Sequence, residues 1–486
     1  MKRKFVTNLI LIILLNLLVK PLWIFGIDRV VQNTVGVKEF GFYGALLNFS
    51  FLLNILLDLG ITNYNNRNIS QNHQLLRKHF SNIVVLRLLM AVGYGLITFA
   101  VALSLGYSGR QLNLLFFLVL NQFLISFTLY LRSNIAGMQM YTVNSLVSVL
   151  DRMLMIIFCA VLIWGKIDGF TFSVEWFVYA QTAAYVLTTL ICFMIVARKS
   201  RFPKFKFDRR FFMVILRQSF PFALLTLLMS AYTRLDAVLL DNLIRPNGDT
   251  QVGIYYHGFR IFDAAYQFAL LFAVLLLPMF SKMLKEHQSV KELTRLSALL
   301  LFVPTIALAA ASQVFRTEIM DILYTDNITE SATFFGIIMT AFLGMAGTII
   351  FGTLLTANGN LRVLNITSAI ALGINLLLNL ILIPRYEAFG AAVSCLATQG
   401  FVGLSQFLIA AWKFRFGFDF RLLARLLLYI SGIVLFGWVT FQVEWPWGTE
   451  FLGMIAASLL LAFLLKLVDV KAMFILIRDG EREGDF

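Results

Sequence analysis

Long apolar stretches, separated by short polar breaks, follow one another from one end of this sequence to the other. Each is roughly 20 residues long, the length that an α-helix needs to cross the hydrocarbon core of a bilayer, and we count about fourteen of them. No polar stretch is long enough to cover a soluble domain of any size. The pattern therefore predicts an all-α membrane protein.

The predicted spans form two groups of six helices and a final pair, with a basic segment between the groups. We expect residues 1–197 to form an N-terminal lobe, 198–210 a cytoplasmic linker, 211–412 a second lobe, and 413–486 two extra helices and a cytoplasmic tail. The predicted spans are 7–27, 40–62, 80–103, 112–135, 142–165, 174–197, 211–240, 252–280, 296–315, 332–356, 363–384, 390–412, 423–441 and 451–468.

Composition and charge agree with a membrane location. Of the 486 residues 59% are hydrophobic and only 14% are charged, whereas soluble domains average about 25% charged residues. The formal net charge is +14, and lysine and arginine concentrate in the loops of one side, as expected for cytoplasmic loops of a bacterial inner-membrane protein. We therefore expect both termini in the cytoplasm, anionic membrane lipids rather than nucleic acid as partners of the linker, and a retained first helix after Lys2-Arg3-Lys4.

Motifs for phosphate-cradling, metal or redox chemistry are missing from the sequence. No G-x-x-x-x-G-K-[ST] occurs, the four histidines have no ligand spacing, and the three cysteines lie far apart in apolar runs. ATP hydrolysis and metal-dependent hydrolysis are therefore disfavoured, and we expect no cofactor, no bound metal and no catalytic residue. The cysteines are interpreted as buried and free.

A faint internal repeat supports two related halves. The segment 39–43, Glu-Phe-Gly-Phe-Tyr, opens the second predicted helix, and 251–255, Gln-Val-Gly-Ile-Tyr, opens the eighth. Pseudo-symmetric transporters are built from such repeats.

Charged side chains inside the spans are the candidates for function, because a charge at bilayer depth costs at least about 2.5 kcal/mol unless it faces a cavity or a partner. Lys20 precedes Pro21, which bends the first helix. Arg152 lies about 13 Å into its span, too deep for easy contact with the headgroups. Arg87 and Arg132 lie near cytoplasmic ends, where their long stems are expected to reach the headgroups.

The seventh and eighth spans carry the densest polar groups. Arg234, Asp236 and Asp241 lie on the seventh, whereas His257, Arg260, Asp263 and Gln267 follow one another at helical spacing on the eighth. This stripe predicts an interior path or a polar neighbour, because lipid does not accept it. Charge pairing, as between Arg260 and Asp263, is the structural alternative.

Carboxylates leave room for ion coupling or charge pairing. A desolvated carboxylate can titrate near neutral pH, and the candidates for proton or sodium coupling or for ion pairs are Asp28, Asp58, Asp151, Asp236 and Asp263. Asp58 has the further alternatives of pairing with Arg67 or capping a loop. The sequence shows no complete ion site.

Several motifs of the chain resemble those of the oligosaccharide and polysaccharide (O-antigen type) flippases of the multidrug/oligosaccharidyl-lipid/polysaccharide exporter superfamily. The resemblance rests on Gly36-x-x-x-Phe40-Gly41-x-Tyr43, Leu57-Asp58-x-Gly60 with Arg67 downstream, and, in the later half, Asn375, Asn379, Ile383-Pro384, Tyr386 and Gly390-Ala391-Ala392.

The resemblance implies two six-helix lobes around a central cavity and alternating access that carries a lipid pyrophosphate-linked glycan outward, as in polysaccharide or lipopolysaccharide assembly. Lipid-linked oligosaccharide would be the substrate, and other polysaccharide-assembly proteins would be partners. Guanidinium groups bind phosphates through paired donors, so the expected substrate-binding residues of the cavity are Lys20, Arg152, Arg234 and Arg260. Two alternatives stay open: a cation-coupled multidrug exporter and a membrane glycan polymerase or ligase.

Overall fold

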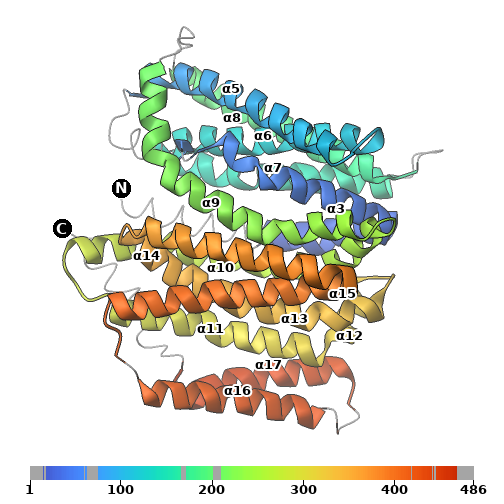
Figure 1. The fold of residues 1–486 in the computed structure, drawn as a ribbon, viewed down its shortest axis with the longest axis vertical. Coiled ribbons are helices and arrows are strands. Elements are labelled where there is room, and N and C mark those ends of the chain that lie inside the picture. Colours follow the sequence, from blue (N-terminus) through green and yellow to red (C-terminus); the bar gives the residue numbers. More distant parts are fainter. Residues whose placement is uncertain are drawn as a thin grey trace. The chain divides into compact units, whose positions relative to one another are not determined.

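The described part of the chain is helical throughout, without a strand. This computed structural model describes residues 15, 18–59, 61–62, 75–138, 140–165, 171–200, 209–417, 419–440, 442 and 445–467. Its elements, shown in Figure 1, are η1 (Leu22–Asp28), α2 (Arg29–Val35), α3 (Val37–Leu52), η2 (Asn54–Leu57), α5 (Leu75–Ser104), α6 (Arg110–Gly137), α7 (Tyr141–Trp164), α8 (Val174–Ser200), α9 (Arg209–Leu243), α10 (Gly248–Lys285), α11 (Lys291–Val314), α12 (Arg316–Leu323), α13 (Ile328–Gly347), η3 (Thr348–Gly352), α14 (Thr353–Ala357), α15 (Leu361–Lys413), α16 (Phe420–Thr440) and α17 (Trp447–Leu464).

Ten helices among the described residues are long and apolar enough to cross a membrane. The prediction of an all-α, multi-pass membrane protein is confirmed, whereas the count of fourteen spans stays a prediction. Large apolar side chains of α16 and α17 are exposed, among them Trp438 at 60% and Phe463 at 67%. Such surfaces are stable in hydrocarbon and would aggregate in water.

The chain forms two compact units, Met1–Gly253 and Ile254–Phe486, here called the N-terminal unit and the C-terminal unit. Helix α9 therefore belongs to the first unit, where it packs on α3, although its residues open the predicted second lobe. The predicted lobe boundaries at 197 and 211 stay a prediction.

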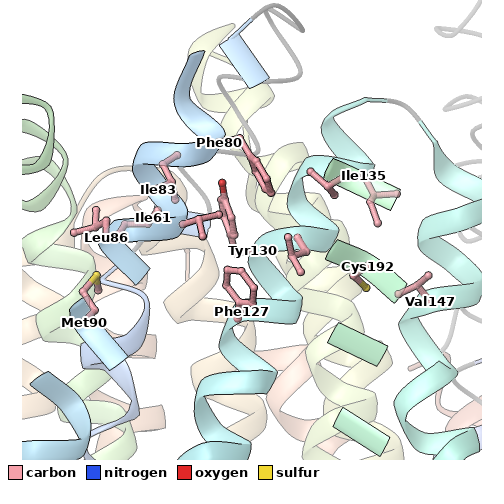
Figure 2. Packing of buried hydrophobic residues seen from close by; sticks show 13 residues of the cluster. Ile61, Phe80, Ile83, Leu86, Met90, Phe127, Tyr130, Ile135, Val147 and Cys192 are labelled. Carbon is pink, nitrogen blue, oxygen red and sulfur yellow. The ribbon is translucent and has the colours of Figure 1, made fainter. Parts of the chain in front are cut away.

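A cluster of buried apolar residues, most of them on α5, α6 and α8, forms a core of the N-terminal unit (Figure 2). Tyr130 is fully buried, with its ring 6.3 Å from the ring of Phe80 and 6.0 Å from that of Phe127. Phe193 of α8 packs 6.0 Å from Phe80. Aromatic contacts at these distances add to apolar burial, and they hold α5, α6 and α8 together.

In the C-terminal unit α13 packs between α11 and α15, while α16 and α17 lie side by side and cover α11. The backbones of α13 and α15 touch at glycine. A Cβ on Gly403 would lie 2.4 Å from the carbonyl oxygen of Gly344, and a Cβ on Gly344 would lie 2.2 Å from that of Gln399. Small residues permit this close approach, which is a common way of packing helices in membranes.

Helix α15 is a hairpin of two helices, in agreement with the two spans predicted at 363–384 and 390–412. Glu387 has non-helical dihedral angles (φ 50°, ψ −130°), and Pro384 precedes it. The amide of Asn375 donates to the hydroxyl of Thr398 over 3.4 Å, although 23 residues of straight helix would separate them by about 34 Å. The two halves therefore lie side by side.

Helix α3 ends earlier than the predicted span 40–62. The α-helical backbone stops at Leu52, a 3₁₀ turn follows at Asn54–Leu57, and Leu59 adopts a positive φ of 44°. No proline or glycine lies between residues 45 and 59, so the break is not a local property of the sequence.

Candidate functional site

Three cations and one carboxylate of the N-terminal unit lie near enough for their charges to interact, and we call these four residues the cationic cluster: Lys20, Arg132, Asp151 and Arg152. Lys20 precedes η1, Arg132 lies on α6, and the adjacent pair Asp151 and Arg152 lies on α7. The charges of Arg152, Asp151 and Arg132 all act on the ammonium group of Lys20. All four side chains are partly buried.

Pro21 shapes the backbone next to Lys20. Proline lacks an N–H group and disturbs the regular helical ladder, and the seven residues after it, Leu22–Asp28, form a π-helix. Trp23, in this segment, is 8% exposed and stacks on Phe177 of α8, with ring centres 5.9 Å apart and planes 8° apart. Wide helical turns of this kind are frequent at functional sites.

Arg152 is held by aromatic groups on two sides. Its guanidinium carbon lies 5.6 Å from the ring centre of Trp23, a distance at which a ring attracts a cation. Its Nη1 donates to the hydroxyl of Tyr185 over 3.4 Å. The hydroxyl of nearby Tyr43 accepts from Gln181 of α8 over 3.2 Å.

The cationic cluster can bind an anion. Three positive charges face one negative charge, so two are not neutralised within the cluster. Guanidinium groups offer paired donors to phosphate or carboxylate, and a low dielectric strengthens the attraction. A group with two negative charges, such as a phosphate ester, matches this excess.

The expectation that the side chain of Arg132 reaches the headgroups stays a prediction. The Nε of Arg132 donates to Asn144 of α7 over 3.3 Å, and its charge acts on Lys20. Distance from a helix end does not reveal direction, because the neighbouring helix determines where a long side chain points.

Arg87 is also expected to reach the headgroups, and this prediction is wrong. Its side chain is 1% exposed and forms an ion pair with Asp58. Asp58 therefore pairs with Arg87, whereas the alternative partner Arg67 lies outside the described residues. Asp28, another coupling candidate, is 3% exposed at the end of η1.

Arg234 and Asp236 of α9 belong to the same unit as the cationic cluster. The guanidinium carbon of Arg234 lies 5.1 Å from the ring centre of Phe51 in α3, and Asp236 is 1% exposed. That these two residues share a cavity with Lys20 and Arg152 stays a prediction.

The polar stripe of α10 lies in the C-terminal unit, where its members have different surroundings. His257 is 1% exposed, its Nδ1 lies 2.6 Å from the hydroxyl of Ser331, and its ring stacks on Tyr324 at 3.9 Å. Arg260 lies 5.0 Å from the ring centre of Tyr256, and Asp263 is partly buried. His257 thus packs inside the unit rather than along a path.

Metal-binding chemistry finds no support in the described ranges. They hold no group of three or more histidine, cysteine, aspartate or glutamate residues that could bind a metal ion. The three cysteines are buried and free, as interpreted from the sequence.

Comparison with known proteins gives the family. Residues 5–284 match the family described as "Polysaccharide biosynthesis protein". A search of curated protein sequences found no match.

Solved structures share the fold at low sequence identity. The lipid II flippase MurJ in an inward closed conformation is 15% identical, with a TM-score of 0.72 over 96% of this chain and 100% of that chain. An inward-facing multidrug resistance MATE family transporter of the MOP superfamily is 17% identical, with a TM-score of 0.64 over 80% and 93%. A MOP superfamily transporter from Pyrococcus furiosus, described with a binding pocket of reverse polarity, is 16% identical, with a TM-score of 0.57 over 84% and 94%.

Proposed function

The chain belongs to the polysaccharide biosynthesis protein family, as its motifs indicated, and on this basis we propose that it is a flippase for a lipid-linked oligosaccharide. The cationic cluster is the observation that carries the proposal. A polyprenyl pyrophosphate head is an anion that must leave water to cross the bilayer, and Lys20, Arg132 and Arg152 offer it positive charge among apolar helices.

The proposed cycle is alternating access without a covalent step. In this cycle the cationic cluster holds the pyrophosphate, the glycan passes through a water-filled path, and the lipid chain remains in hydrocarbon. We place the protein in the bacterial inner membrane with both termini in the cytoplasm, where it receives repeat units of a polysaccharide such as O-antigen and delivers them to assembly proteins on the outer face. The lobe fold shared with MurJ and MATE transporters supports this cycle.

A flipping assay tests the proposal. The purified protein is reconstituted in vesicles with a fluorescent polyprenyl-pyrophosphate disaccharide, and dithionite quenching measures how fast the probe crosses. We expect Arg152→Gln and Arg132→Gln to slow crossing about tenfold or more, because each removes a hydrogen-bond donor with a charge from the anion.

The matched control is Arg362→Gln, which removes an exposed arginine at the start of α15. The probe should cross at the wild-type rate in this variant. Wild-type rates in Arg152→Gln, Arg132→Gln and Lys20→Gln alike, with protein correctly inserted, contradict the proposal.

A second candidate, a cation-coupled multidrug exporter, is favoured by the buried carboxylates Asp28 and Asp236, which are 3% and 1% exposed. Organic cations bind carboxylates rather than arginines. That function requires ethidium export from the same vesicles, loss of export in Asp28→Asn, and no crossing of the pyrophosphate probe. Elongation of the probe's glycan would instead identify a polymerase.

A further inference from the structure

The break in α3 is stabilised by side chains of α5 and α6 and not by its own sequence. Residues 51–59 read Phe-Leu-Leu-Asn-Ile-Leu-Leu-Asp-Leu, and leucine and isoleucine continue helices readily. A sharp interruption without proline or glycine requires a side chain that enters the helical hydrogen-bond ladder. Two side chains do so here.

Arg87 and Tyr94 of α5 occupy carbonyl groups that a continuous helix would use. The hydroxyl of Tyr94 donates to the carbonyl of Ser50 over 2.7 Å, which in an α-helix accepts from residue 54. Nη1 of Arg87 donates to the carbonyl of Leu57 over 2.8 Å. The backbone instead closes tighter turns, from Leu56 to Leu53 and from Asp58 to Ile55.

Arg87 holds the far end of the break through the two terminal nitrogens of its guanidinium group, Nη1 and Nη2. Besides Leu57, Nη1 donates to the hydroxyl of Ser126 on α6 over 2.8 Å. Nη2 donates to the carboxylate of Asp58 and to the hydroxyl of Thr62. The guanidinium carbon also lies 5.2 Å from the ring centre of Tyr130, in the core of Figure 2.

Asp58 is the less enclosed partner. Its side chain is 28% exposed, whereas that of Arg87 is 1% exposed. It also accepts from the backbone N–H of Thr62 over 3.2 Å and from the Thr62 hydroxyl. A charge that remains in reach of solvent can separate from its partner at lower cost than one enclosed by apolar groups.

We propose that Asp58 and Arg87 form a latch: Arg87 is a positioning residue that keeps the segment after Leu52 in its broken form, and release of Asp58 lets this segment rejoin α3 as one continuous helix. Converting the four residues of η2 from 3₁₀ to α geometry shortens the segment by about 2 Å and turns the residues after it by about 80°. The latch thus converts one ion pair into a rotation of a membrane helix.

Thiol accessibility tests the latch without reference to any substrate. Leu57 is 1% exposed in the broken form, and the rotation would change its surroundings. We expect N-ethylmaleimide to alkylate Leu57→Cys slowly in the otherwise wild-type protein. Alkylation should become about tenfold faster or more when Arg87→Lys is added, because lysine cannot supply the hydrogen bonds that Nη1 and Nη2 of Arg87 make. The native cysteines are buried and give the background.

Leu46→Cys is the matched control, since Leu46 is also 1% exposed but lies in the regular part of α3. Its alkylation should stay slow in Arg87→Lys. Asp58→Asn, which keeps the shape of the side chain, should also accelerate alkylation of Leu57→Cys. It replaces Arg87→Lys in the experiment if the Arg87→Lys protein does not insert into the membrane. The proposal is overturned if both cysteines become reactive together, which makes Arg87 a general support of the unit, or if neither does.

Discussion

Gly41 and Gly253 lie against each other where the first turns of α3 and α10 cross, and neither could carry a side chain. A Cβ on Gly41 would lie 1.8 Å from the carbonyl oxygen of Asp249, and a Cβ on Gly253 would lie 2.0 Å from that of Val37. Val37 and Asp249 each precede a repeat glycine by four residues, so the contact is reciprocal, as at a two-fold axis. The faint repeat therefore marks a physical contact.

The first prediction concerns this crossing. Gly41→Ala should lower the free energy of unfolding by about 1–3 kcal/mol, because the helices must move apart to admit the methyl group. Gly93→Ala is the control, since a Cβ there meets nothing within 4 Å; it should be neutral or slightly stabilising. Denaturant titration in micelles gives both values, and equal effects would show that the crossing is loose.

The second prediction concerns Arg110, which joins the starts of α3, α6 and α8. It donates to both carboxylate oxygens of Glu39, over 3.0 and 2.5 Å, and to Glu175 over 2.6 Å. The group is half exposed, so Arg110→Gln should cost only about 1 kcal/mol, and less at high salt. Lys38, whose side chain is 70% exposed, holds its ammonium group 3.8 Å from Asp249. Lys38→Gln should therefore change stability less than Arg110→Gln, and a larger loss in Lys38→Gln would contradict this ranking.

The third prediction concerns the buried bond between His257 and Ser331. Ser331→Ala should destabilise the protein by about 1–3 kcal/mol, because the ring nitrogen of His257 loses its partner away from water. Thr333→Ala, at an exposed site in the same turn of α13, should stay within about 0.5 kcal/mol. Thermal unfolding measures both, and a neutral Ser331→Ala would mean that a water molecule replaces the hydroxyl.

The fourth prediction concerns Tyr185, whose hydroxyl accepts from Arg152. Tyr185→Phe should slow crossing of the pyrophosphate probe about two- to tenfold, because a single hydrogen bond that orients Arg152 is lost. Tyr179→Phe removes a hydroxyl from the same helix, where the ring packs 4.6 Å from Phe117, and should leave the rate unchanged. Equal rates for the two variants would remove Tyr185 from the site.

The fifth prediction concerns pH and Asp419, which lies outside the spans. The backbone N–H of Leu422, at 3.0 Å, and then the charge of Arg295, at 3.1 Å, hold the pKa of this carboxyl below its usual value of 3.8. A lowered pKa in the folded state stabilises the protein above pH 3.8, and this contribution disappears as the pH falls through the lowered value. The difference in thermal stability between wild type and Asp419→Asn should therefore be constant near neutrality and shrink below pH 3.8. A difference that stays the same below pH 3.8 would contradict this prediction.

The candidate site could be predicted only in part. Lys20 and Arg152 were chosen for their depth in the membrane, and the structure brings them together in the cationic cluster. Arg87 lies near a helix end and is expected at the headgroups, yet its side chain is enclosed in the unit and pairs with Asp58. Depth along a span follows from counting residues, whereas the direction of a long side chain depends on which helix lies beside it.

The sequence by itself determined that this protein is a bundle of membrane helices of the polysaccharide biosynthesis family. Hydrocarbon offers the backbone no hydrogen bonds, so an apolar stretch of about 20 residues has to satisfy its own N–H and C=O groups as a helix. Only the tertiary structure decided where such a stretch leaves the α-helical form. The leucine-rich end of α3 is interrupted because Arg87 and Tyr94, which lie on α5, supply hydrogen bonds that the helix itself would otherwise have made.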